Sequence, residues 1–288
     1  FAMSGGMEAR IFAGHLQKVL ALPLVPLVLG GALMMGRAKS RQSIVLWGLT
    51  TGLVHGFTFL AGESFLQIFL FVAVPLIVVI VSKGEAGLSW VHRVIWGLVA
   101  WGAGLVVATA GKLVAAVSVL TETVRNVNPY IGSEHSYWAI VHLATPPLPD
   151  AFQHTFYGWW EYSQYIGIVP VILAGVACGA VILRISRCES ILESSFRTGE
   201  VLALLAVIVL GALWLANGFL YSPVHWLYVA VPPLHDFRVP SRALMLTSPA
   251  ALALGAVGLE AVLSGPRLRA PTIAISFGAF SLIAIWLV

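Results

Sequence analysis

Charged residues are scarce in this chain of 288 residues. Asp, Glu, Lys and Arg together make up 10% of the sequence, whereas soluble proteins carry roughly 25%. So few charges cannot cover the surface of a water-soluble protein of this length. A hydrophobic fraction of 59% also excludes a disordered chain, because disordered chains are poor in apolar residues.

The sequence also lacks the common signatures of metal, disulfide and nucleotide sites. Its two cysteines, Cys178 and Cys188, form neither a disulfide framework nor a metal-binding spacing. His135, His142 and His154 match no zinc pattern. There is no P-loop, no Gly-x-Ser-x-Gly elbow and no dinucleotide fingerprint. We therefore expect no cofactor, while a divalent metal stays an open alternative. The net charge of +4 comes from dispersed basic residues, so no nucleic-acid partner is expected.

Long apolar runs are what the sequence has instead. A helix needs about 20 mostly apolar residues to cross a bilayer, and eight such runs are present, with no alternating pattern of the kind found in β-barrels. They cover residues 19–36, 43–62, 64–82, 94–118, 163–184, 201–219, 243–264 and 270–288. The sequence therefore predicts an all-α, polytopic integral membrane helical bundle of about eight transmembrane helices. We expect residues 1–288 to form a single transmembrane domain.

The distribution of Lys and Arg predicts the orientation of this bundle. Ten of the 16 basic residues fall in or beside the connections after the first, third, fifth and seventh runs. The positive-inside bias places these connections in the cytoplasm. The residues before 19 and the segments 119–162 and 220–242 are then extracytoplasmic. These two segments are much longer than ordinary connections of about 4–6 residues, which favours a functional role for the outer side.

The motif Asp236-Phe-Arg-Val-Pro-Ser-Arg242 is the most distinctive local feature of the outer side. Arg238 and Arg242 are four residues apart, just before the seventh run. Two guanidinium groups at a membrane surface can clamp a phosphate, because each offers a forked, permanently charged set of donors. Lipid headgroup contacts, or pairing with Asp236, are the alternatives that spacing alone favours.

Three further outer features supply candidate ligand-binding or catalytic residues. Arg10 and His15 precede the first run and can bind a polar headgroup or anchor the chain at the interface. Glu63 lies in the short turn 61–64, where a carboxylate can act as a base or remain a hydrated turn residue. Glu161 and Tyr162 lie in an aromatic segment, 156–165, that suits either carbohydrate stacking or an aromatic belt.

One histidine lies inside an apolar run. His55 is part of the second run, and polar groups within a membrane are costly and often functional. Hydrogen bonding between helices is the simpler interpretation of this residue, and we expect it here.

Several of these motifs, taken in order, resemble the bacterial YfhO-like membrane proteins, which are similar to the GT-C superfamily of glycosyltransferases. The segments that carry the resemblance are Ser4-Gly-Gly-Met-Glu-Ala-Arg-Ile-Phe-Ala-Gly-His-Leu16 with Leu22-Pro-Leu-Val-Pro-Leu27, Leu60-Ala-Gly-Glu-Ser64, Glu161-Tyr-Ser-Gln-Tyr-Ile-Gly-Ile-Val-Pro170, and Phe237-Arg-Val-Pro-Ser-Arg-Ala-Leu244. The resemblance covers most of the chain. It implies a GT-C-like fold in the bacterial cytoplasmic membrane.

The resemblance implies an extracytoplasmic transferase. Such enzymes move a sugar from a polyprenyl-phosphate-linked donor to a cell-envelope glycan, lipid or protein acceptor. Arg238 and Arg242 would meet the carrier phosphate, and Arg10 and His15 match an early motif. The principal acidic residue of these enzymes usually lies in a first outer loop that precedes all of this sequence. We therefore expect an internal fragment of a longer protein, also because the chain starts at Phe1 and stops inside an apolar run.

Two other functions fit the same sequence. O-antigen polymerases and ligases also have long outer loops with Arg and His. A transporter is the alternative from another class, with Glu63, His55 and Lys112 as its candidate polar residues. A transporter would predict repeats and broken helices near the bilayer midplane. No clear internal repeat is visible, so the transferase is the leading interpretation. Membrane lipid and the lipid-linked donor are the expected partners, and the oligomeric state is left open.

Overall fold

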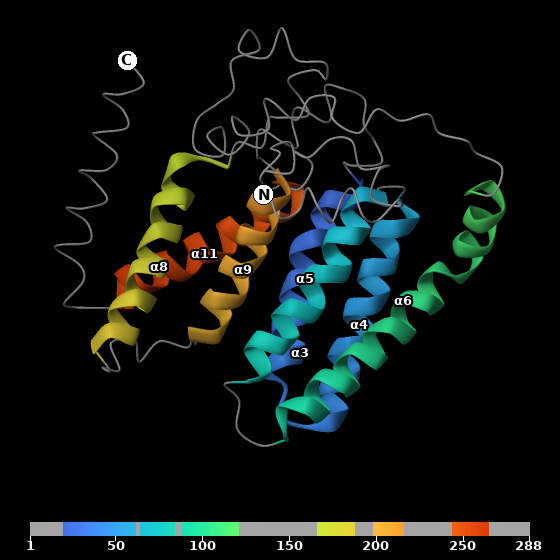
Figure 1. Ribbon diagram of the computed structural model, residues 1–288, viewed down its shortest axis with the longest axis horizontal. Helices are drawn as coiled ribbons and strands as arrows, with labels where there is room; N and C mark the ends of the chain where they lie inside the picture. The colour runs from blue at the N-terminus through green and yellow to red at the C-terminus, as the bar shows by residue number, and fades with distance from the viewer. Residues whose placement is uncertain are drawn as a thin grey trace, which may run out of the picture.

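Helices are the only regular elements in the part of the chain that the structure, a computed structural model, describes: residues 20–61, 64–83, 88–120, 166–187, 198–215 and 244–264 (Figure 1). A short 3-10 helix, η1, spans Leu22–Leu24. The α-helices are α3 (Val25–Arg37), α4 (Arg41–Leu60), α5 (Ser64–Ser82), α6 (Trp90–Leu120), α8 (Ile168–Arg187), α9 (Thr198–Leu215) and α11 (Leu244–Ser264).

These helices coincide with the first seven apolar runs of the sequence, whose positions are thereby confirmed. The eighth run, 270–288, lies outside the described residues. The ends differ by a few residues where local chemistry sets them. Ser40 caps α4 earlier than the apolar pattern indicates, because its hydroxyl accepts a hydrogen bond from the Ser43 amide at 3.2 Å. Before α8, Gly167 has a φ of 93°, so α8 begins later than the predicted run.

Three of the described helices are long and apolar enough to cross a membrane: Arg41–Leu60 of α4, Trp90–Lys112 of α6 and Met245–Leu263 of α11. The other four are shorter apolar stretches. Large apolar side chains also face outward along the helices, among them Leu46, Val99 and Val107, which are 64%, 60% and 74% exposed. Such faces are expected where a bundle contacts lipid rather than water. An all-helical membrane bundle is therefore the class that the described helices favour.

Glycines bring α4 and α6 into backbone contact. Gly48, Gly52 and Gly56 recur every four residues and form one stripe of α4. A Cβ on Gly52 would collide with the carbonyl oxygen of Trp101, and one on Gly104 with the carbonyl oxygen of Leu49. Small residues at this spacing let two helices approach closely, which replaces the hydrophobic driving force that is absent between helices in lipid. The prediction that membrane glycines serve helix packing is confirmed for these positions.

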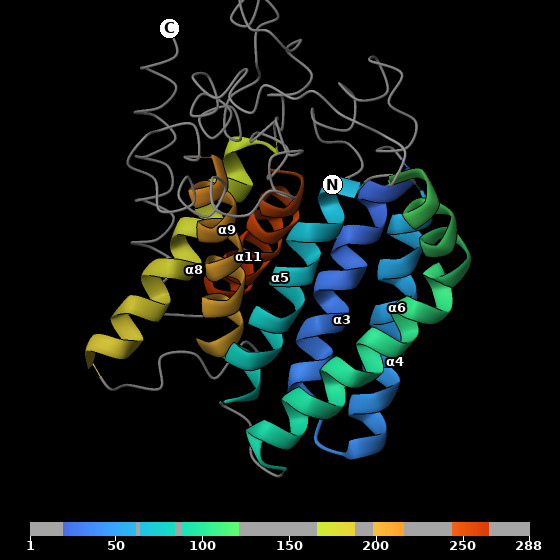
Figure 2. The ribbon, with the colours of Figure 1, turned by 45° about the vertical axis from the view of Figure 1, so that its right-hand side comes forward.

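Two groups of helices make up the described bundle. Helices α3, α4, α5 and α6 pack together in one group, and α8, α9 and α11 form the other (Figures 1 and 2). In the second group, Gly255 and Gly258 of α11 lie against the backbone of Pro170 and Leu173 of α8. Contacts of α5 with α9, and of α11 with α3 and α5, join the groups into one apolar core.

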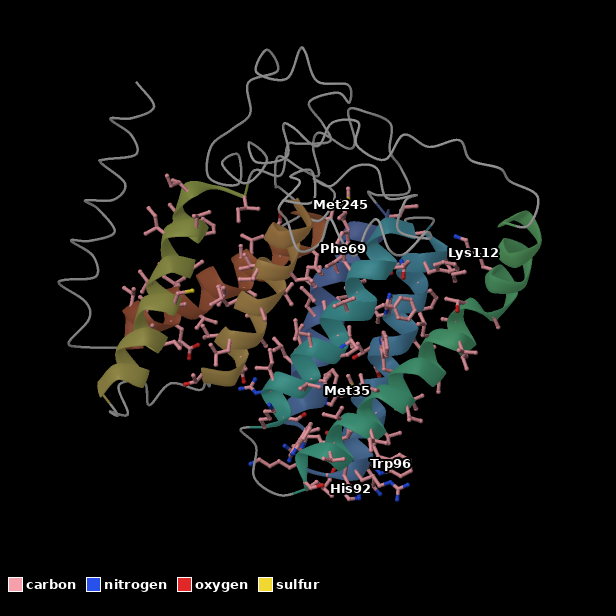
Figure 3. The ribbon with its side chains drawn as sticks, in the orientation of Figure 1. Met35, Phe69, His92, Trp96, Lys112 and Met245 are labelled. Atoms are coloured by element: carbon pink, nitrogen blue, oxygen red, sulfur yellow. The ribbon has the colours of Figure 1, made fainter. Side chains whose placement is uncertain are left out.

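Consecutive described helices run in opposite directions, which separates the bundle into two ends. Arg37, Lys39, Arg41, Lys83 and Arg93 lie where α3 and α5 end and α4 and α6 begin; this is called the basic end. Lys112 lies near the opposite end, together with the last turn of α4, and this is called the Lys112 end. Figure 3 shows His92 and Trp96 at the basic end of α6 and Lys112 far along the same helix. This separation agrees with the alternation of sides that the sequence predicts.

Candidate functional site

All of the predicted site residues lie outside the described residues. They are Arg10, His15, Glu63, Glu161, Tyr162, Arg238 and Arg242. The outer segments 119–162 and 220–242 lie outside them as well, apart from the start of the first, since α6 continues to Leu120. The described helices nevertheless contain a buried polar cluster, and this cluster is the candidate functional site.

The cluster is centred on His55 of α4, which is fully buried. Its imidazole stacks on Trp101 of α6, with ring centroids 5.6 Å apart and planes at 25°. Phe71 of α5 lies on another side, 5.2 Å from His55 and 5.4 Å from Trp101. Three helices therefore each supply one ring to an aromatic triad of His55, Phe71 and Trp101.

A polar chain continues from His55 to α5. Gln67 Nε2 donates a hydrogen bond of 2.8 Å to Thr58 Oγ1, and that hydroxyl donates one of 2.6 Å to the carbonyl oxygen of His55. Gln67 is also the polar side chain that faces the imidazole. All three residues are buried. The triad and this chain, His55, Phe71, Trp101, Thr58 and Gln67, are called the His55 cluster.

The nitrogen atoms of the aromatic triad have no hydrogen-bond partner among the described residues. This holds for both ring nitrogens of His55 and for Nε1 of Trp101. The expectation that His55 makes hydrogen bonds between helices is therefore not met in the described part of the chain: ring stacking holds this side chain instead. A buried donor or acceptor without a partner costs about 1–3 kcal/mol, so such groups call for a functional or structural explanation.

Lys112 links α6 to the last turn of α4. Its Nζ donates hydrogen bonds of 2.6 Å to the carbonyl oxygen of Phe59 and 3.2 Å to that of Leu60. The last carbonyls of a helix have no partner within the helix, and they carry the negative end of its dipole. Lys112 satisfies both needs, and its outward reach, expected from the sequence, ends on α4.

Two other buried charges lie at the basic end. Arg93 is fully buried, and its Nη1 donates a hydrogen bond of 3.1 Å to the carbonyl oxygen of Ser82, the last residue of α5. Glu200, in the first turn of α9, lies 2.6 Å from Nε of Arg37. Both contacts join helix ends, so a structural role accounts for them.

The His55 cluster offers an imidazole, an amide and a hydroxyl in an apolar setting. These groups can accept, donate or relay protons. No group of three or more His, Cys, Asp or Glu residues suited to a metal ion occurs among the described residues. The sequence identified His55 as unusual but not Gln67 or Trp101 as its neighbours. An amide near the start of a strongly apolar run was the available signal for Gln67.

Comparisons with protein-family models, with curated proteins and with solved structures found no match to this chain. The resemblance to YfhO-like proteins therefore rests on the sequence motifs alone and stays a prediction.

Proposed function

We propose that this chain is the membrane part of a GT-C-like glycosyltransferase with about eight membrane-spanning helices. In this proposal it transfers a sugar from a polyprenyl-phosphate carrier to a cell-envelope acceptor at the outer face of a bacterial cytoplasmic membrane. The Lys112 end of the bundle is the outer end, and the basic end faces the cytoplasm, as the positive-inside bias favours.

One observation supports this proposal most. Helix α5 follows Glu63 directly, and α11 begins two residues after Arg242. Both helices begin at the Lys112 end, where Phe69 of α5 and Met245 of α11 lie close together (Figure 3). The candidate carboxylate and the candidate phosphate clamp thus each precede a helix that starts on the same side of the bundle.

The proposed chemistry is an inverting transfer. A carboxylate upstream of this sequence removes the proton of the acceptor hydroxyl. The acceptor oxygen forms the new bond to the sugar carbon, while the bond from that carbon to the carrier phosphate breaks and the phosphate leaves with the electron pair. Arg238 and Arg242 stabilise the charge that grows on the phosphate. The membrane holds the lipid tail and so limits the orientations of the donor.

The test is the double substitution Arg238→Ala and Arg242→Ala in the full-length protein. Sugar transfer and binding of the lipid-linked donor should both fall by at least about 100-fold, since removing one such stabilising donor typically costs that much. Unchanged transfer together with unchanged donor binding would remove these arginines from the proposal. Acceptor analysis then separates this enzyme from a polymerase or ligase, which would transfer whole glycan chains rather than single sugars.

The His55 cluster favours a second candidate, a transporter. An ionisable residue fully buried between three apolar helices is a common feature of ion or proton pathways in membranes. The substitution His55→Phe separates the two functions, because it keeps a ring in the triad and removes both nitrogens. A transporter would lose substrate uptake in proteoliposomes, whereas a transferase would keep sugar transfer.

A further inference from the structure

Two tryptophans near the start of α6 each lie under a cation of the basic end. The guanidinium carbon of Arg41, the first residue of α4, is 3.8 Å from the ring centroid of Trp96. The ammonium of Lys83, just after α5, is 5.8 Å from the ring centroid of Trp90. Both distances are within the roughly 6 Å over which a cation is attracted to an aromatic face.

Stacking keeps these two cations at the surface rather than in the core. Arg41, Lys83 and Trp90 are exposed, and Trp96 is half-buried. The neighbouring cations are used differently, because Arg37 pairs with Glu200 and Arg93 is buried beside Ser82. Stacking on a ring also leaves the guanidinium edge of Arg41 open to an anion, since the fork of donors lies in its plane.

Anionic groups are few beside these cations. Glu200 and Glu260 are the acidic side chains among the described residues. Glu200 pairs with Arg37, and Glu260 is near the end of α11, a helix with no substantial contact with α4 or α6. Within the described helices, Arg41 and Lys83 therefore have no carboxylate to neutralise them, and the surface is complementary to an anion.

Apolar faces continue from the same cations toward the Lys112 end. On α4 they include Leu46 and Leu49, and on α6 they include Ile95 and Val99, all exposed. A phosphate held beside Arg41 would thus have uncovered aliphatic surface next to it. This combination of cation, aromatic ring and aliphatic face matches a phospholipid better than a free anion or a protein.

We propose that Arg41, Lys83, Trp90 and Trp96 form a binding site for the phosphate headgroup of an anionic phospholipid. This site is called the headgroup site. The phosphate contacts the edge of Arg41 and the ammonium of Lys83, and the acyl chains lie along the exposed faces of α4 and α6. The headgroup site lies at the end of the bundle opposite to the proposed transferase chemistry, so it does not depend on that function.

The experiment titrates phosphatidylglycerol and phosphatidylcholine separately into the delipidated full-length protein in a neutral detergent. Native mass spectrometry measures the bound lipid. The unchanged protein should prefer phosphatidylglycerol. The double substitution Arg41→Gln and Lys83→Gln should weaken that preference by about 5-fold for each lost cation. Phosphatidylcholine binding should change little.

Two further variants distinguish a built site from general surface charge. Trp96→Leu keeps every charge but removes the ring under Arg41, so the preference should fall by about threefold. Lys39→Gln removes one exposed cation of the basic end for which no stacking contact is found, and should lower the preference less than twofold. The melting temperature of each variant in the same detergent verifies that the helices remain folded.

Three results would overturn the headgroup site. The first is an unchanged preference for phosphatidylglycerol in the double variant. The second is a loss in Lys39→Gln as large as that in Arg41→Gln, or no effect of Trp96→Leu, either of which would indicate diffuse charge only. The third is displacement of the lipid by excess inorganic phosphate, which would indicate a site for a free anion.

Discussion

Arg37 at the end of α3 and Glu200 at the start of α9 form an ion pair with 2.6 Å between Nε and Oε1. The pair joins the two groups of helices at the basic end. Each charge also suits its helix, because a cation is favourable at a helix C-terminus and an anion at an N-terminus. The two side chains differ in burial: Arg37 is 30% exposed and Glu200 is 1% exposed.

This difference predicts unequal effects of removing the two partners. Arg37→Ala leaves a carboxylate buried without its cation, and should lower the free energy of unfolding by about 2–3 kcal/mol. Glu200→Gln should cost less, about 1 kcal/mol, because the partly exposed Arg37 can still be hydrated. Reversible unfolding in mixed detergent micelles measures both. Equal losses, or a larger loss for Glu200→Gln, would contradict this account of the pair.

The glycine contact between α4 and α6 predicts a steep position dependence for alanine substitutions. Gly52→Ala should lower the free energy of unfolding by about 1–3 kcal/mol, because the new methyl group collides with the Trp101 carbonyl and the two backbones must separate. Gly102→Ala on α6 is the matched control, since a Cβ there meets nothing within 4 Å. It should be neutral or stabilising, because alanine is the better helix former. Similar behaviour of the two variants would refute the close packing of these helices.

The position of Lys112 predicts a local effect on the last turn of α4. Lys112→Met should lower stability by about 1 kcal/mol, because two carbonyl oxygens lose a charged donor. Amide hydrogen exchange should become faster at the end of α4, near Leu60 and Ala61, and remain unchanged near its start. Lys112→Arg keeps a cationic donor and should retain most of the protection. Uniform acceleration along all of α4 would instead indicate that Lys112 supports the helix globally.

Packing of His55 predicts that its nitrogens do not contribute to folding. His55→Phe should leave the free energy of unfolding unchanged or raise it by up to about 1–3 kcal/mol, because two buried nitrogens without hydrogen-bond partners are removed while a ring is retained. His55→Ala should destabilise the protein, because it leaves a cavity between Phe71 and Trp101. Unfolding measurements on both variants test this. A large loss in His55→Phe would show that the imidazole nitrogens have stabilising partners.

The two ends of the bundle predict the accessibility of introduced cysteines. In a background lacking Cys178 and Cys188, Lys39→Cys should react with a membrane-impermeant maleimide only after the cells are opened. Ala61→Cys, beyond the end of α4, should react in intact cells. Both residues are at least partly exposed. The reverse pattern would invert the orientation given by the positive-inside bias, and with it the side on which the proposed transferase acts.

The apolar runs predicted the described helices well because length and hydrophobicity are properties of contiguous sequence. The run 64–82 coincides with α5, and Ser82 marks its end before the polar turn at Lys83. Boundaries set by single side chains were less accurate: α6 begins at Trp90, earlier than expected, and Ser89 Oγ accepts a weak hydrogen bond from the His92 amide at 3.4 Å. Arg93, taken as a loop residue, is a buried residue of this first turn.

The candidate site was predicted less well, because burial and partners are not local properties. His55 attracted notice as a polar residue in an apolar run, but its neighbours Trp101 and Gln67 belong to other helices. The period of a helix indicates which residues share a face, yet it does not say which helix that face meets. The stacking of His55 on Trp101 depends on the register of α4 against α6, which glycines at both surfaces allow.

The sequence by itself determined that this chain is apolar, helical and asymmetric in its basic residues, because these features follow from composition and order along the chain. Only the tertiary structure decided that Gly52 meets Trp101, that Arg37 meets Glu200 and that Arg41 lies on Trp96. Each of these contacts joins different helices, and their geometry depends on how the helices of the bundle pack at once. Close packing fixes which side chains meet, since a shift of one helix would separate several such pairs together.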